Sequence, residues 1–159
     1  MKQNSILKLV YIHLAIIGIC VICNAHIKTD DHLPEAKKAI AESNLIYFDL
    51  YAKNDGSILK LYTADACLMP PNAPAICGLA ALAKDFKDTY AAGVVKSGKF
   101  TTTAIYGDGP EYVTEEGLWQ VFDKNGQTID DGKYLKLWKK TAEGWKMLRD
   151  SFNSNHKQK

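Results

Sequence analysis

The sequence has little of what marks several common functional classes. Its 159 residues include only 11 Gly and 5 Pro, and 20 Lys and Arg nearly balance 18 Asp and Glu. This composition excludes collagen-like and low-complexity chains, and an apolar fraction of 47% argues against disorder. The sequence also lacks a Gly-x-Ser-x-Gly motif, a phosphate-binding glycine loop and a dinucleotide-binding fingerprint. We expect one globular domain, because the length leaves little room for two.

Long apolar runs are also absent, except for 15 residues at positions 9–23 that only His13 interrupts. A helix needs about 20 apolar residues to cross a bilayer. Lysines precede the run, and Cys23 and Ala25 place small residues at the −3 and −1 positions of a cleavage site. We therefore predict a signal peptide over residues 1–25 and a polar lead-in over 26–33. The protein would be exported, periplasmic or secreted, with no stable membrane association after cleavage. An uncleaved anchor is the alternative.

Cleavage after Ala25 would remove Lys2, Lys8 and no acid, and would leave 134 residues with 18 basic and 18 acidic side chains. A neutral chain without a basic cluster lacks the electrostatic footprint that nucleic-acid binding requires. We therefore expect no nucleic-acid partner.

Histidine is scarce where a metal or catalytic site would need it. The four histidines are His13, His26, His32 and His156. These lie in the predicted signal peptide, the lead-in and a short tail over 156–159 that we expect to be disordered. A His-based metal site or dyad would require His156 to fold back onto the domain. We expect no metal and no cofactor.

Two cysteines, Cys67 and Cys77, remain after cleavage. In an exported protein they suggest a disulfide, and the sequence between them reads as a Pro-rich loop flanked by two short strands. Two buried free thiols are the alternative.

The first part of the mature chain is helical in pattern. Ile40, Tyr47 and Tyr51 follow at spacings of seven and four, and Leu45 and Phe48 would widen this apolar stripe. The pattern predicts a helix over 34–53, a short second one over 57–61, a strand over 66–69 and a third helix over 78–93. Four β-rich segments follow, at 99–106, 111–123, 127–141 and 144–153. This order predicts an α+β domain whose helices pack on one face of an antiparallel sheet.

Both faces of the predicted sheet carry apolar side chains. Trp119 and Val121 alternate with Leu118 and Phe122, so neither face is purely polar. Because the helices can cover only one face, we expect the open face to form a homodimer. The alternative is that the aromatic side chains lie partly exposed among lysines.

The order of elements and several sequence motifs resemble the SnoaL-like, nuclear transport factor 2-like superfamily. The matching segments are Asp55–Ala66, Pro70–Pro74 followed by Gly78, Asp131–Lys139, Gly144–Lys146 and Asp150–Asn153. The last three are most similar to a branch described as a domain of unknown function. The resemblance covers about residues 34–155.

The resemblance implies a cone-shaped, cystatin-like fold in which a curved antiparallel sheet wraps around a long N-terminal helix, with two further helices. It also implies a pocket at one end and, usually, a homodimer. Ketosteroid isomerases, polyketide cyclases, dehydratases and non-catalytic domains share this fold, so the fold does not define the activity. The resemblance implies that an isomerase of this fold uses a carboxylate base at the end of the first strand, a tyrosine and a protonated carboxylic acid. Tyr47 lies about where the tyrosine should be, but Pro70 occupies the position of the base. The position of the acid falls within residues 134–136.

Polar side chains that could turn into the cone provide the candidate site. We predict Tyr47, Lys133 and Asp150 as catalytic residues, on the expectation that Lys133 and Asp150 pair inside the cone. The candidate ligand-binding residues are Tyr51, Glu115, Trp119, Asp131 and Asn153. Asp131, Lys133, Asp150 and Asn153 could instead form a network that fixes the end of the sheet.

Two functions are compatible with these residues. The first is an exported, non-catalytic domain that binds a small, largely apolar ligand. The second is an isomerase, cyclase or dehydratase-like enzyme that uses a Tyr/Asp/Lys acid–base set.

Overall fold

The computed structural model describes residues 32–157. The predicted signal peptide, its cleavage site, most of the lead-in and residues 158–159 lie outside the described residues. The elements are α2 (Leu33–Lys53), the 3-10 helix η2 (Ser57–Leu61), β1 (Tyr62–Met69), β2 (Ile76–Cys77), α3 (Leu79–Ala92), β3 (Ser97–Tyr106), β4 (Tyr112–Phe122), β5 (Thr128–Thr141) and β6 (Gly144–Ser154). Within this range no helix is long and apolar enough to span a membrane.

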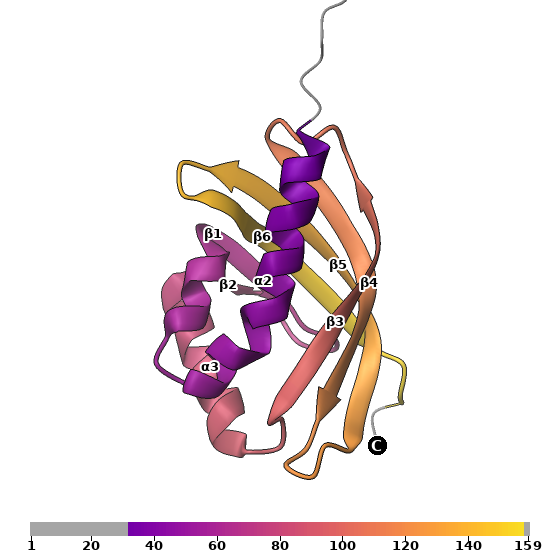
Figure 1. The fold of residues 1–159 in the computed structure, drawn as a ribbon. Coiled ribbons are helices and arrows are strands. Elements are labelled where there is room, and N and C mark those ends of the chain that lie inside the picture. The colour runs from indigo at the N-terminus through magenta and orange to yellow at the C-terminus, as the bar shows by residue number, and fades with distance from the viewer. Residues whose placement is uncertain (1–31, 158–159) are drawn as a thin grey trace, which may run out of the picture. The chain divides into compact units, whose positions relative to one another are not determined.

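The six strands form one sheet in the order β2-β1-β6-β5-β4-β3 (Figure 1). The segment from β3 to β6 is the predicted antiparallel meander. The sheet as a whole is mixed, however, because β1 runs parallel to β6. The predicted α+β architecture is therefore confirmed, with one parallel pair where a fully antiparallel sheet was expected. That pair arises because α3 separates β1 from the meander, so the last strand returns beside the first.

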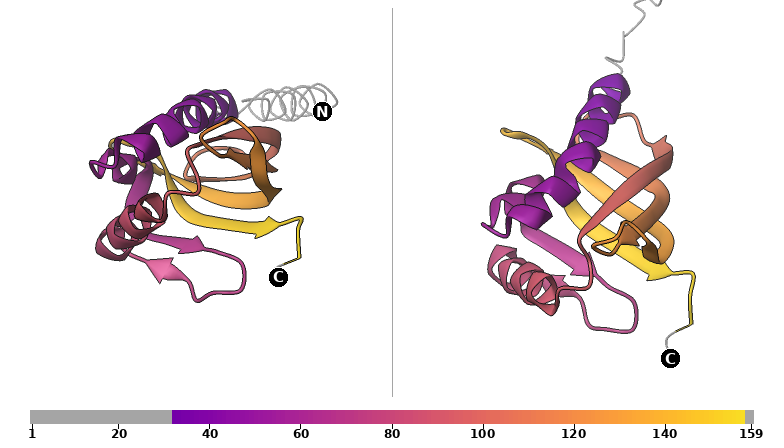
Figure 2. Two further views of the ribbon diagram at one scale, coloured as in Figure 1. Left: turned by 90° about the horizontal axis from the view of Figure 1, so that it is seen from below. Right: turned by 60° about the horizontal axis from the view of Figure 1, so that its bottom comes forward.

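Helix α2 covers the concave face of the sheet, which curves around it (Figure 2). Ala36, Ile40, Tyr47, Leu50 and Tyr51 are its buried residues, so the predicted stripe of seven- and four-residue spacings is confirmed. Leu45 does not widen that stripe, because its side chain is 81% exposed. Five residues after Ile40, Leu45 points well away from the buried face at about 100° per residue.

The direction of the side chains on β5 differs from our prediction and changes the candidate site. Tyr134, Lys136 and Trp138 are buried beneath α2, whereas Lys133 and Leu135 point to the open face. The expectation that Lys133 turns into the cone is therefore wrong. Two large aromatic side chains share one parity of the strand, and burying them also buries Lys136, which lies between them.

A disulfide joins Cys67 of β1 to Cys77 of β2. The two cysteines are directly paired across this short antiparallel ladder. The bridge closes the loop that contains Pro70, which lies at the cavity described below. It thereby ties the cavity wall to the edge of the sheet.

The open face of the sheet exposes Leu118 and Leu135, which are 46% and 52% accessible. A shallow depression on this face is lined by these leucines together with Thr103, Glu116 and Lys133. Apolar side chains on a face that no helix of residues 32–157 covers fit the predicted homodimer, which stays a prediction.

Candidate functional site

A cavity of about 550 Å³ lies between α2, α3 and the concave face of the sheet. Its size is typical of small-molecule sites, which range from about 300 to 1,000 Å³. Val94 and Ile129 line it and are exposed, so the mouth lies between the segment after α3 and the start of β5. Figure 1 shows the end of α3 and the β4–β5 hairpin at the same end of the molecule. The cavity is therefore the open end of the predicted cone.

The wall of the cavity is mainly aromatic and aliphatic. Its lining residues include the aromatic side chains of Tyr47, Phe48, Tyr51, Phe86, Phe100, Trp119, Tyr134 and Phe152. Several of these rings pack edge to face, such as Tyr47 against Phe100, with centroids 5.0 Å apart. The wall would therefore contact a ligand mainly through rigid apolar surface.

Asp150 brings a carboxylate into this apolar wall. The residue is only 4% exposed, and its Oδ2 accepts a hydrogen bond of 3.0 Å from the Tyr62 hydroxyl. The Tyr62 hydroxyl lies 3.0 Å from that of Tyr47, so three polar groups form a buried chain. Burial raises the pKa of Asp150, while Lys136 and the hydrogen bond from Tyr62 lower it by less. Burial and the charge of Asp150 also raise the pKa of Tyr47, which keeps its hydroxyl protonated.

Lys136 is a fully buried cation behind this wall. Its Nζ donates to Asn44 Oδ1 at 3.2 Å and lies 3.4 Å from the centroid of the Phe100 ring. Burial lowers the pKa of Lys136, whereas the nearby carboxylates of Asp150 and Glu115 raise it. Lys136 is also the direct cross-strand neighbour of Asp150. Lys136, and not Lys133, is therefore the lysine whose charge acts on Asp150, and the expected Lys133–Asp150 pairing is wrong.

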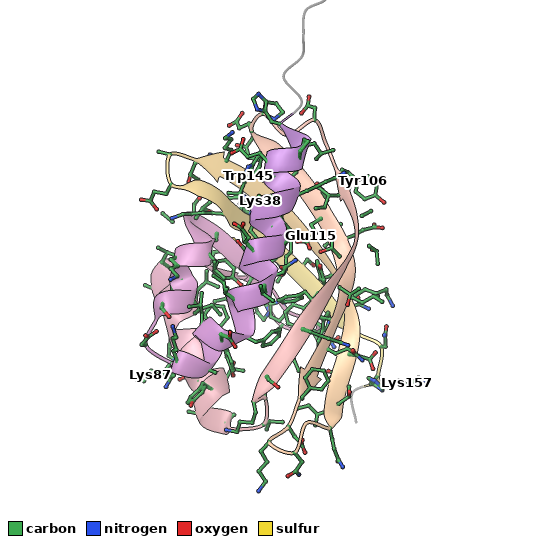
Figure 3. All side chains as sticks on the ribbon, viewed as in Figure 1. Lys38, Lys87, Tyr106, Glu115, Trp145 and Lys157 are labelled. Atoms are coloured by element: carbon green, nitrogen blue, oxygen red, sulfur yellow. A yellow bond between two sulfur atoms is a disulfide. The ribbon has the colours of Figure 1, made fainter. Side chains whose placement is uncertain are left out.

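Glu115 is fully buried on the α2 side of β4 and is labelled in Figure 3. Its Oε1 accepts hydrogen bonds from Asn44, Thr102 and Tyr134 at 2.6–2.7 Å, and its Oε2 accepts one from Trp138 at 2.9 Å. Four donors occupy this carboxylate, and Glu115 is not among the cavity-lining residues. Its contacts make it a connection between α2 and the sheet.

Glycines on the meander make room for the aromatic wall. A Cβ at Gly117 would lie 2.5 Å from the Tyr134 hydroxyl, and one at Gly132 would lie 2.7 Å from Trp119 Nε1. Gly117 therefore accommodates Tyr134, its cross-strand partner, rather than a ligand. Gly132 lets Trp119 lie across β5 and donate to the Asn153 carbonyl at 3.1 Å.

Four of the eight predicted site residues line the cavity: Tyr47, Tyr51, Trp119 and Asp150. Glu115 is buried beside it. The other three, Asp131, Lys133 and Asn153, lie outside it, near the C-terminal end of β6. There Asp131 contacts Asn155 and His156, Lys133 donates to Asn155, and the Asn153 side chain is exposed.

His156 does fold back, but onto the surface. Its Nε2 lies 3.1 Å from Asp131 Oδ2, and its side chain is 63% exposed. Within residues 32–157, no group of three or more His, Cys, Asp or Glu side chains could hold a metal ion.

Sequence reasoning missed Tyr62, Lys136, Asn44 and Asp85. Lys136 could have been found, because it shares strand parity with Tyr134 and Trp138. Tyr62 was missed because the strand was predicted to start at Ala66, four residues too late. Asn44 and Asp85 lie on helices, and no local pattern indicates that their side chains meet the sheet or the cavity.

The comparisons with known proteins support the fold. No protein-family profile and no curated protein matches this chain. Several solved structures, however, are similar to this chain in fold. A nuclear transport factor 2-like superfamily protein from Salmonella enterica aligns with a TM-score of 0.62 and 20% identity, over 80% of this chain and 96% of that one. An NTF2-like protein with a cystatin-like fold from Novosphingobium aromaticivorans aligns with a TM-score of 0.65 and 17% identity, over 79% and 86%.

A ketosteroid isomerase-like protein from Erwinia carotovora is also similar, with a TM-score of 0.60 and 19% identity over 74% of this chain and 95% of that one. At these identities the similarity demonstrates a shared fold and no shared activity. The predicted resemblance is confirmed at the level of the fold: the chain has an NTF2-like, cystatin-like architecture.

Proposed function

We propose that this protein is an exported domain that binds a small, largely apolar molecule in the cavity without transforming it. The observation that carries the proposal is the cavity itself, in which one buried carboxylate, Asp150, interrupts an aromatic wall. Such walls give affinity through apolar burial, and a few polar groups fix orientation. Pro70 stands where an isomerase of this fold would carry its base, which favours binding over that chemistry.

The proposal predicts that a small molecule accompanies the purified protein. Native mass spectrometry should detect its added mass, and the same spectrum should show whether the chain begins at His26. Val121 lines the cavity, so Val121→Trp should reduce occupancy at least about fivefold by filling part of it, because a ligand cannot share space with a close-packed side chain. Ile46→Trp on the exposed side of α2 is the matched control and should keep the ligand. An empty wild-type protein in repeated preparations would contradict the proposal.

The second candidate is an enzyme in which Asp150 transfers a proton and Tyr47 donates a hydrogen bond to the substrate. The raised pKa of Asp150 favours it, because an acid–base group works best when its pKa approaches the ambient pH. Tyr47 lines the cavity, and its hydroxyl would turn from Tyr62 to donate to a substrate. Lys133 has no part in this candidate, because it lies on the other face of the sheet.

Asp150→Asn separates a functional carboxylate from a structural one. A carboxyl group with a raised folded-state pKa adds stability below its unfolded pKa of about 3.9, and this stability is lost as the pH rises through the folded pKa. The ionised Asp150 therefore costs stability at pH 7. The asparagine oxygen can still accept a hydrogen bond from Tyr62, so at pH 7 the variant should melt at the wild-type temperature or higher. At pH 4 its melting temperature should exceed that of the wild type by less.

Thermal melts at both pH values test this expectation. A drop of several degrees at pH 7 would make Asp150 a structural residue. If a turnover assay becomes available, unchanged turnover in Asp150→Asn would exclude the acid–base candidate.

A further inference from the structure

The charged side chains that line the cavity are all acidic. They are Asp85 of α3, Asp130 of β5 and Asp150 of β6. No Lys, Arg or His of the described part of the chain lines it. Among the described residues Lys136 is the one buried lysine, and the charges of Glu115 and Asp150 act on it from behind the wall. The ionisable groups that a ligand would meet in the cavity are therefore carboxyl groups.

A second observation comes from Tyr51, which is only 6% exposed and lines the cavity. Its hydroxyl is fully buried and has no hydrogen-bond partner within the described residues. A buried hydroxyl without a partner costs about 1–3 kcal/mol. A ligand that reaches Tyr51 with a polar hydrogen would remove that cost.

One region of the cavity, around Tyr47, is influenced electrostatically by Tyr51, Asp85 and Asp150. The charges of Asp150 and Asp85 both raise the pKa of Tyr47, as does Tyr51. Burial raises the pKa of Asp85, and its neighbour Asp88 raises it further. A positive charge in this region would therefore favour the ionised form of both carboxyl groups.

The aromatic wall suits the same kind of ligand. Ring faces attract ammonium groups, most strongly where water is excluded. Lys136 already uses this attraction, with its Nζ within 4.5 Å of the ring centroids of Phe100 and Tyr134. The rings of Tyr51 and Phe86 also line the cavity, with centroids 6.5 Å apart, and offer aromatic surface to a second cation.

Building on the proposed function, we infer that the ligand is a cationic amphiphile: an amine or ammonium group on an apolar body. The cation lies between Asp85 and Asp150, within reach of the Tyr51 hydroxyl, and the apolar body extends along Trp119 toward the mouth. The acidic lining without a basic group disfavours carboxylate and phosphate ligands, because an anion there would meet like charges in an apolar surrounding.

Three probes of one shape and different charge test this inference. They are 6-phenylhexylamine, 6-phenylhexan-1-ol and 6-phenylhexanoate, titrated at pH 7 into the purified protein after ligand removal, with calorimetry and tryptophan fluorescence as readouts. The amine should bind about tenfold more tightly than the alcohol, and the carboxylate more weakly than both, because one charge-assisted contact has about that effect on affinity.

Variants locate the charge effect. The double variant Asp85→Asn, Asp150→Asn should lower the affinity for the amine about tenfold and leave that for the alcohol within about twofold. Asp49→Asn is the matched control, because Asp49 is an exposed aspartate of α2 that does not line the cavity. It should bind all three probes as the wild type does.

The outcomes distinguish this inference from the proposed function. If the alcohol or the carboxylate binds as tightly as the amine, the cationic inference is overturned while binding in the cavity stands. An equal loss of amine affinity in Asp49→Asn would also overturn it, since the effect would then be one of surface charge. If no probe binds, the inference fails, and the occupancy of wild type against Val121→Trp still decides the proposed function.

Discussion

Lys136→Met should lower the free energy of unfolding by about 3–5 kcal/mol at pH 7, the range seen when one partner of a buried ion pair is removed. Lys136 is fully buried, and Glu115 and Asp150 are the carboxylates that act on its charge. Methionine has a similar length and would keep most of the packing against Phe100. The loss therefore measures the charge, because two buried carboxylates would remain without a buried cation.

Urea denaturation of the variant at pH 7 and pH 4.5 measures this effect. The loss should be smaller at pH 4.5, because Asp150, whose pKa is raised, takes up a proton more readily there and removes part of the repulsion. Lys133→Met is the matched control, since Lys133 lies on the same strand but is exposed on the open face. Equal effects of the two substitutions would contradict the role assigned to Lys136.

Glu115→Gln should also destabilise the protein strongly, by about 3 kcal/mol at pH 7. The glutamate accepts from Asn44, Thr102, Tyr134 and Trp138, and each of its oxygens faces a donor. A glutamine has one acceptor oxygen and one NH₂ group, which would face another donor in a buried site. The change keeps the size of the side chain, so any loss reports on hydrogen bonding and charge.

The neighbouring residue provides the control for this prediction. Glu116 lies on the opposite face of β4 and lines the shallow depression of the open face. Glu116→Gln should change the free energy of unfolding, measured by urea denaturation, by less than about 0.5 kcal/mol. If Glu115→Gln is equally mild, the hydrogen bonds that join Asn44 of α2 to β4 contribute less to stability than their geometry implies.

The local elements were predictable because their signals lie within a few neighbouring residues. The helix with Ile40, Tyr47 and Tyr51 on its buried side was predicted within one residue of its observed start. The third helix was predicted over 78–93, and α3 spans Leu79–Ala92, within one residue at each end. Such preferences are set by local backbone geometry and periodic burial, which a linear sequence displays.

The candidate site was only partly predictable, because its residues meet through strand parity and register. Lys133 and Lys136 are both lysines on one strand, and only the packing of Tyr134 and Trp138 decides which of them is buried. Tyr62 reaches Asp150 across 88 positions of the chain, and no local pattern encodes that contact. Asp85 was missed for the same reason, since it joins the cavity only after α3 packs against the sheet.

The sequence by itself excluded several classes of site, because histidine is scarce and nucleotide-binding and hydrolase motifs are lacking. It also determined the α+β fold through the order of its helices and strands. Only the tertiary structure decided that Glu115, Lys136 and Asp150 share one interior. It also decided that, among the residues it describes, the ionisable side chains at the cavity wall include three aspartates and no lysine, arginine or histidine. The physical reason is that the energy of a buried charge depends on partners and solvent exclusion in three dimensions, whereas secondary structure depends largely on neighbours in sequence.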